Sequence, residues 1–182
     1  MFNILKRVTI SNTEITVNDM PVFTFQENQN TTNALKEVYR YFKMDYLKFF
    51  KMDNLSKLGF LSAEILLKEV ENKENMSILF GTSSSSLETD TAFQETIKDT
   101  DNFFPSPSVF VYTLPNIVIG EICIRHKIYG ENMMFIVNEN NISDFYQNMQ
   151  YLINAMGIKK GIIGYLDCYQ NSFQAELILF EQ

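Results

Sequence analysis

The sequence predicts a single α/β domain in which helices pack against a central, largely buried sheet. Short apolar runs of strand length, 76–80 and 133–137, alternate with longer segments of helical periodicity. Two further apolar segments, 161–169 and 173–181, flank a turn at Gln170-Asn171-Ser172 and predict a C-terminal β-hairpin. Strands separated by helices favour parallel pairing with right-handed crossovers, whereas the last pair is expected to be antiparallel.

Size and charge narrow the function classes. A chain of 182 residues with 46% hydrophobic content can form one domain, 1–182, that buries roughly 70% of its unfolded surface. Its net charge of −7, with both signs mixed along the chain, argues against nucleic-acid binding. The longest apolar stretch, 109–124, contains Pro115, Gly120 and Glu121, so we expect no membrane span. No signal-peptide pattern is present, and we expect a reduced, cytoplasmic protein.

The first third of the chain predicts a small strand unit followed by a buried helix. Segment 7–25 alternates branched and polar residues, which favours a meander or hairpin, and 26–33 is a polar loop. The motif Phe-Lys-Met-Asp occurs at 42–45 and again at 50–53, a spacing that matches no solenoid repeat. Asp53 is then the expected N-cap of a helix over 54–72 that is apolar on much of its circumference.

The middle of the chain continues the alternation. A buried strand, 76–80, leads through a serine-rich loop into a helix over 87–99. Two prolines in 103–110 predict a rigid bend, and Pro115 ends one short helix and begins a second. A second buried strand, 133–137, precedes a helix over 142–156 that stops at Gly157.

Few residues carry recognisable chemistry. We expect His126 to be structural, and Cys123 and Cys168, which lack metal-ligand spacing, to be small buried residues. The serine-rich loop 81–86 has neither a Walker lysine nor a GxGxxG fingerprint, so a connecting loop is favoured over a phosphate site. We expect neither a metal nor a cofactor. Segment 135–145 predicts a strand, a polar turn and a helix, which is either a nucleophile turn without its nucleophile or an ordinary turn.

Four stretches resemble, in this order, the N-terminal half of β-ketoacyl synthases of the thiolase fold. They are FFKMDNLSKLGFLSAEILLKE, SILFGTSSSSLETDTAFQETI, PSPSVFVYTLPNIVIGEICIRHKIYG and FIVNENN…INAMGIKKGIIGYLDCY. The resemblance runs from about residue 42 to the end, is most specific in SPSVFVYTLPNIVIGEI and KMDNLSKL, and is weak over 1–40. It implies the N-terminal half of a thiolase-like fold, with a mixed central sheet.

The resemblance also implies a missing catalyst. In the family a catalytic cysteine stands at a helix N-terminus, and alignment places that position at Glu139 or Asn140. The family's two active-site histidines belong to a second half, which would begin beyond Gln182. Whether the protein is an enzyme stays open, but we expect no condensing activity from this polypeptide alone.

Family members without the cysteine are chain-length factors, which pair with an active synthase, and some in aryl-polyene-type pathways are truncated. We therefore expect a noncatalytic subunit that pairs with a full-length ketosynthase and helps set acyl or polyene chain length in fatty-acid- or polyketide-type biosynthesis. Its contact with the chain on the acyl carrier protein would be indirect. The implied dimer-interface strand is Met133, Met134, Phe135, Ile136, Val137 and Asn138. The implied partner-tunnel residues are Phe110, Tyr112, Leu114, Asn116 and Ile117, although each can equally be core.

Two alternatives remain. The first is a homodimeric scaffold or binding protein made of two half-thiolase domains, with a large apolar interface. The second is a malonyl-thioester decarboxylase in which Glu139 or Asn140 orients the substrate. A carboxylate would oppose the negative charge of an enolate, whereas an asparagine can donate a hydrogen bond.

Overall fold

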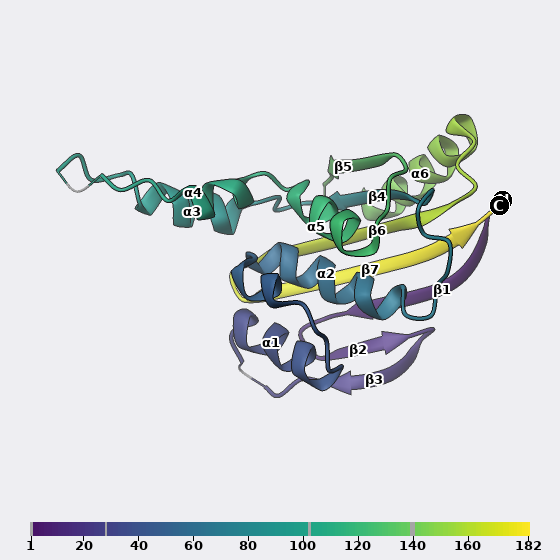
Figure 1. Ribbon diagram of the computed structural model, residues 1–182, viewed down its shortest axis with the longest axis horizontal. Helices are drawn as coiled ribbons and strands as arrows, with labels where there is room; N and C mark the ends of the chain where they lie inside the picture. Colours follow the sequence, from purple (N-terminus) through teal and green to yellow (C-terminus); the bar gives the residue numbers. More distant parts are fainter. Residues whose placement is uncertain (1, 28, 102, 139–140) are drawn as a thin grey trace.

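The protein contains one mixed sheet with helices on both faces, as a computed structural model of residues 2–27, 29–101, 103–138 and 141–182 shows (Figure 1). The strands are β1 Asn3–Ile10, β2 Glu14–Val17, β3 Met20–Thr24, β4 Ser77–Thr82, β5 Asn132–Ile136, β6 Lys160–Tyr169 and β7 Ser172–Glu181. The helices are α1 Thr31–Tyr41, α2 Asn54–Leu66, α3 Leu87–Glu95, α4 Pro107–Phe110, α5 Ile117–His126 and α6 Ile142–Met156, with 3₁₀ turns η1 Leu47–Lys51 and η2 Val111–Thr113.

The sheet has the strand order β3-β2-β1-β7-β6-β4-β5. Strand β4 pairs in parallel with β5 and β6, and the remaining pairs are antiparallel, which confirms the predicted mixed sheet and C-terminal hairpin. Segment 7–25 is a meander, as predicted. Its second turn has positive φ at Asn18 and Asp19, and the β6–β7 turn has positive φ at Gln170 and Asn171. Two such residues in a row are typical of the type I′ turn that suits the twist of a hairpin.

Two hydrophobic clusters hold the layers together. The larger lies between the sheet and helices α1, α2 and α5, where nearly all of α2 is buried, as its sequence predicts. Asp53 caps α2 by accepting a hydrogen bond of 2.9 Å from the Ser56 amide. The smaller cluster joins α6 to the opposite face through Phe145, Met149 and Ile153.

Four sequence predictions need correction. The helices predicted over 54–72 and 87–99 end earlier, at Leu66 and Glu95. Strand 133–137 was expected to be buried, but β5 is an outer strand of the sheet, and Ile136 is 61% exposed. Apolarity alone does not distinguish an edge strand from a central one. The predicted loop 26–33 contains the start of α1, because Asn30 accepts a hydrogen bond from the Asn33 amide and makes a polar run the first helical turn.

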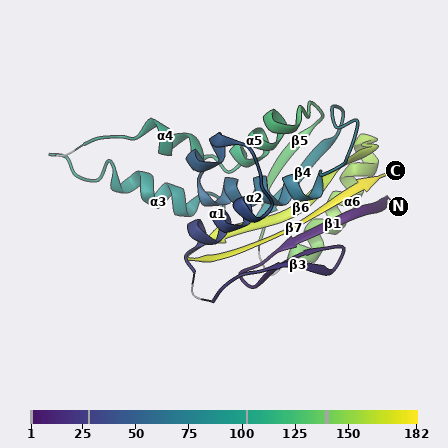
Figure 2. The same ribbon diagram turned by 60° about the horizontal axis from the view of Figure 1, so that its bottom comes forward.

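Helices α3 and α4 project from one end of the sheet as a long hairpin, here called the arm (Figures 1 and 2). We define the arm as residues 87–110, of which Asn102 lies outside the described residues. The chain ends lie together at the opposite end of the sheet, where Asn3 of β1 pairs with Glu181 of β7 (Figure 2). The sheet therefore separates the arm from both termini.

An ion-pair cluster joins α2 to the end of α5. The Glu64 carboxylate accepts a hydrogen bond of 2.9 Å from Arg125 Nε, and His126 Nε2 lies 3.0 Å from the same oxygen. The Arg125 guanidinium also lies 5.0 Å from the centre of the Tyr46 ring. Burial raises the pKa of Glu64, but His126 and Arg125 outweigh it and lower the pKa to about 2. The contact agrees with a structural role for His126.

We expect Glu64→Gln to lower the free energy of unfolding by about 1 to 3 kcal/mol at pH 7, because it leaves the half-buried donors of Arg125 and His126 with a weaker acceptor. The depressed pKa of Glu64 means that its charge stabilises the fold above about pH 4.5, and that this contribution disappears as the pH falls towards 2. Urea unfolding between pH 7 and pH 3 tests this. The difference from wild type should shrink as the pH falls, whereas Glu71→Gln, at an exposed residue, should change little at any pH.

Candidate functional site

The carboxyl ends of β4, β5 and β6 lie side by side at one end of the sheet. Open α/β sheets usually carry their binding or catalytic sites at this end of their strands. The predicted strand and helix are present there as β5 and α6. Val137 N donates to Thr82 O at 2.9 Å, and Asn141 N donates to Asn138 O at 2.9 Å. The predicted nucleophile-equivalent residues, Glu139 and Asn140, lie outside the described residues.

The serine-rich loop after β4 is organised around one carboxylate. Asp167 Oδ1 accepts hydrogen bonds from the backbone amides of Ser83 and Ser84, at 3.0 and 2.7 Å, and from the Thr82 hydroxyl at 2.8 Å. Its second oxygen accepts from the Ser84 hydroxyl at 2.8 Å. The amides that would hold an external phosphate are thus used by an anion of the chain itself. This geometry supports the interpretation of 81–86 as a connecting loop.

Strand β5 presents an open edge. Glu131 O accepts from Ile78 N, and Val137 N donates to Thr82 O, so alternate residues of the strand bond to β4. The backbone groups of Asn132, Met134 and Ile136 therefore face away from β4. Within the described chain, β5 has a neighbouring strand on one side only.

The six residues of the predicted interface strand divide between the two faces of the sheet and the solvent. Met133, Phe135 and Val137 are half-buried and pack against the α6 cluster. Met134 packs against the larger cluster, whereas Ile136 and Asn138 are exposed.

The five predicted tunnel residues do not share one environment. Phe110, Leu114 and Asn116 are exposed, the first two by 54% and 51%. Ile117 is half-buried against the larger core cluster, and Tyr112 is buried. Only the first three lie where a second molecule can reach them directly.

Tyr112 attaches the α4–η2 segment to helix α5. Its hydroxyl donates to Glu121 Oε1 at 3.2 Å, and Lys48 Nζ lies 2.8 Å from the same oxygen. Burial and the neighbouring Glu121 charge raise the pKa of Tyr112, so the hydroxyl keeps its proton and donates. The Ser86 hydroxyl donates to Thr113 O at 2.6 Å beside it. Sequence reasoning missed Glu121, although it is the one charged residue within the apolar run Ile117–Ile124.

A cleft of about 610 Å³ lies between the start of α2, α3 and the α4–η2 segment. Its wall contains Met52, Asp53, Asn54, Glu88, Thr89, Val109 and Tyr112. The Thr89 hydroxyl donates to Asp53 Oδ2 at 2.9 Å, and Asn54 Nδ2 donates to Glu88 Oε1 at 2.6 Å. Burial raises the pKa of Asp53 despite the hydrogen bonds from Ser56 and Thr89. None of these polar residues was singled out from the sequence as a wall of a cleft.

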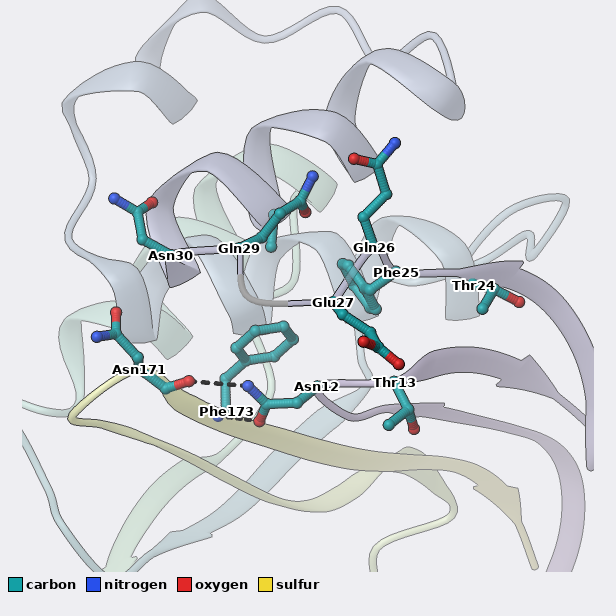
Figure 3. A pocket seen from close by; sticks show the side chains of 11 residues that line it. Asn12, Thr13, Thr24, Phe25, Gln26, Glu27, Gln29, Asn30, Asn171 and Phe173 are labelled. Atoms are coloured by element: carbon teal, nitrogen blue, oxygen red, sulfur yellow. Dashed lines mark hydrogen bonds between the residues drawn. The ribbon is translucent and has the colours of Figure 1, made fainter.

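A larger hollow of about 720 Å³ lies between the β1–β2 turn, the loop before α1 and the β6–β7 turn (Figure 3). The Asn12 amide is occupied there, since it donates to Asn171 O and accepts from Phe173 N, both at 2.8 Å. Among the described lining residues, Glu27 is the one charged side chain. The hollow therefore offers no cluster of reactive groups.

Further chemistry is scarce in the described part of the chain. Burial raises the pKa of the Cys123 thiol, and burial with the nearby Glu88 charge raises that of Cys168, so neither favours the reactive thiolate. No group of three or more His, Cys, Asp or Glu residues within the described ranges could hold a metal ion.

By length and apolarity, none of the described helices could cross a membrane by itself. The pair Pro107–Thr113 and Ile117–His126 would pass the same criteria together, but it is bent by 98°.

Comparison with known proteins identifies the fold. No family model matches the chain, and no curated protein matches its sequence. Solved structures do match. A chain of the ketosynthase in complex with its chain length factor from Xenorhabdus doucetiae aligns with a TM-score of 0.70 and 13% identity, covering 100% of this chain and 79% of that one.

Two further structures extend the comparison. The ishigamide ketosynthase/chain length factor aligns with a TM-score of 0.69 and 15% identity over 98% of this chain and 61% of that one. A complex of a type II PKS acyl-carrier protein with its ketosynthase bound to the hexaketide aligns with a TM-score of 0.62 and 11% identity. This alignment covers 100% of this chain and 62% of that one. The chain thus spans less than two thirds of these two. It has the thiolase-like fold of the matched chains, including residues 1–40, where the sequence resemblance was weak.

We expect Asp167→Asn to lower the free energy of unfolding by about 1 to 3 kcal/mol, because the amide is a weaker acceptor for the two loop amides and places a donor against them. Hydrogen exchange at Ser83 and Ser84 should accelerate. Urea unfolding and amide exchange measured by mass spectrometry test both effects. Asp99→Asn, at an exposed position on the arm, is the matched control and should behave as wild type. Unchanged exchange in Asp167→Asn would show that the carboxylate does not organise the loop.

Proposed function

We propose that the protein is a noncatalytic ketosynthase-like subunit that pairs with a full-length β-ketoacyl synthase and helps set the length of the acyl or polyene chain made by the pair. The observation that carries the proposal is the open edge of β5. It lies directly before the position at which the sequence resemblance implies Glu139 or Asn140 in place of a cysteine. The thiolase-like fold, matched in complexes of ketosynthases with chain length factors, supports it.

The two edges of the sheet are built differently. Strand β3, at one edge, contains Pro21, which cannot donate to a neighbouring strand, and its pairing with β2 is irregular at Ile15 and Thr16. Strand β5 has no proline and pairs regularly along its length. An unprotected apolar edge is an aggregation hazard unless another chain covers it. The difference favours β5 as the strand that meets a partner.

The arm and the adjoining residues 111–114, here called its base, add an apolar surface. Phe103, Phe104, Phe110, Val111 and Leu114 are between 46% and 74% exposed. Aromatic side chains such as these three phenylalanines are enriched at the centres of stable interfaces. We propose that the partner ketosynthase covers this surface together with β5.

The proposed division of labour follows from these positions. The partner would supply the nucleophile and carry out condensation, and contact with the carrier-bound chain would be indirect. Phe110, Leu114 and Asn116 are exposed and can reach the partner's acyl tunnel, where their size would limit the chain. Tyr112 and Ile117 act from inside by supporting them.

The homodimeric scaffold is less well supported in its half-thiolase form. In that form two copies would stack through the sheet face that carries α6. This would bury Arg7, which lies 3.4 Å from Glu176 and 3.9 Å from Asp19. It would also bury the exposed residues Asp144 and Tyr151. Removing these charges from water is costly. A homodimer through β5 would use the same edge as the proposed heterodimer. The decarboxylase alternative rests on Glu139 and Asn140, outside the described residues.

We expect Ile136→Lys to prevent assembly with the full-length partner ketosynthase, because a lysine on an edge strand opposes pairing with another strand. Co-purification and analytical ultracentrifugation of the co-expressed pair measure this. Met20→Lys is the matched control, since Met20 is also exposed, at 67%, but lies on the opposite edge. A wild-type pair that does not associate, or an Ile136→Lys pair as stable as wild type, would contradict the proposal. A β5 homodimer would appear as dimers of the isolated wild-type protein.

We expect Phe110→Ala and Leu114→Ala to shift the products of the reconstituted pair towards longer chains, because each removes side-chain volume where the chain would end. Mass spectrometry of the products, with the complex quantified in parallel, is the measurement. Tyr151→Ala, at an exposed residue of α6, controls for loss of a large surface side chain. The same product distribution in all variants would reject a role of this segment in chain length.

A further inference from the structure

One carboxylate lies inside the core at the base of the arm. Glu121 of α5 is 4% exposed and stands between the buried residues Val118, Ile119 and Ile122. Its Oε1 meets Tyr112 and Lys48, and its Oε2 has no hydrogen-bond partner among the described residues. Burying a carboxylate costs several kcal/mol unless its partners compensate fully. An apolar residue of similar size would serve packing better, so stability alone does not account for Glu121.

The group that Glu121 contacts controls the direction of the surrounding segment. Tyr112 is the buried side chain of α4 and η2, whereas Phe110, Val111 and Leu114 beside it are exposed. In a tight helical turn, neighbouring side chains point in fixed relative directions. Holding Tyr112 inward therefore holds the apolar side chains outward, and it also fixes the aromatic wall of the 610 Å³ cleft.

Lys48 pairs with Glu121 from the solvent side. It comes from η1, its side chain is 45% exposed, and its ammonium lies 2.8 Å from Glu121 Oε1. The ammonium therefore reaches both water and the buried side chain, and hydrogen bonds within an ion pair are stronger than those between neutral groups. The three side chains thus connect η1, η2 and α5.

We infer that Glu121 and Lys48 are positioning residues: through Tyr112 they hold segment 107–117 in the orientation in which Phe110, Val111 and Leu114 face a partner. This inference rests on the proposed function for its effect on products. It makes a distinctive prediction, because apolar residues can replace a buried ion pair without lowering the stability of the fold. If the pair instead orients segment 107–117, the same replacement should leave stability unchanged but loosen the segment.

The decisive variant is the double substitution Glu121→Leu with Tyr112→Phe, compared with the single substitutions Glu121→Gln and Tyr112→Phe. We expect the double variant to unfold in urea at or near the wild-type midpoint, since no polar group is left unpaired. Its backbone amides in 107–117 should nevertheless exchange about tenfold faster, equivalent to roughly 1.4 kcal/mol of local opening. Assembled with the ketosynthase, it should give a broader range of product lengths.

Glu64→Gln is the matched control, because it removes another carboxylate that contacts α5 but lies away from the arm. It should lower stability while leaving exchange in 107–117 and product lengths unchanged. Wild-type exchange in 107–117 of the double variant would overturn the inference, and so would unchanged product lengths from an intact complex. If the wild-type protein does not bind the ketosynthase, the proposed function fails, and the exchange measurement still decides whether Glu121 positions the segment.

Discussion

The loop after β4 and the position of β5 both depend on strand β4, which is buried along its whole length and pairs in parallel on both sides. The parallel pairing brings the carboxyl ends of β4, β5 and β6 to the same end of the sheet, and β5 is the outermost of the three strands. On the face of α6, close packing maintains this arrangement: a Cβ on Gly81 would lie 3.1 Å from the Phe145 ring. The helix that follows the polar turn therefore sits close to the strand because β4 carries no side chain at that point.

The sequence predicted the elements whose signals are local. Asp53 marked the start of α2, Gly157 the end of α6, and the alternating C-terminal segments the last hairpin. The local pattern alone predicted β5 as a buried strand, because edge position depends on which strands pair, whereas the family resemblance implied a strand that meets a partner. The Asp167 network was equally hidden, since it joins Ser84 to a residue 83 positions away. Within the site, the strand and the helix were predictable, but the different environments of the five tunnel residues were not.

Carboxylates in this protein mark the places where separate elements must keep a fixed relation. Asp167 ties the loop after β4 to β6, Glu64 ties α2 to α5, and Glu121 ties α5 to η1 and η2. Asp167 and Glu64 are half-buried and each contacts several groups of one neighbouring segment, whereas Glu121 is buried and contacts two segments. A hydrophobic contact tolerates sliding, whereas a hydrogen-bonded carboxylate specifies direction as well as distance. Such contacts suit a protein whose proposed task is to present a surface rather than to react.

The position of the chain ends has a practical consequence for working with the protein. Because Asn3 and Glu181 are paired at the end of the sheet away from the arm, a linker joined to either terminus would emerge on the side remote from the arm. Immobilisation through a terminal tag should therefore leave the arm accessible in surface-based binding assays. The same adjacency means that residues 3 and 181 can be bridged by a short peptide and this domain reopened elsewhere, which makes it suitable for circular permutation.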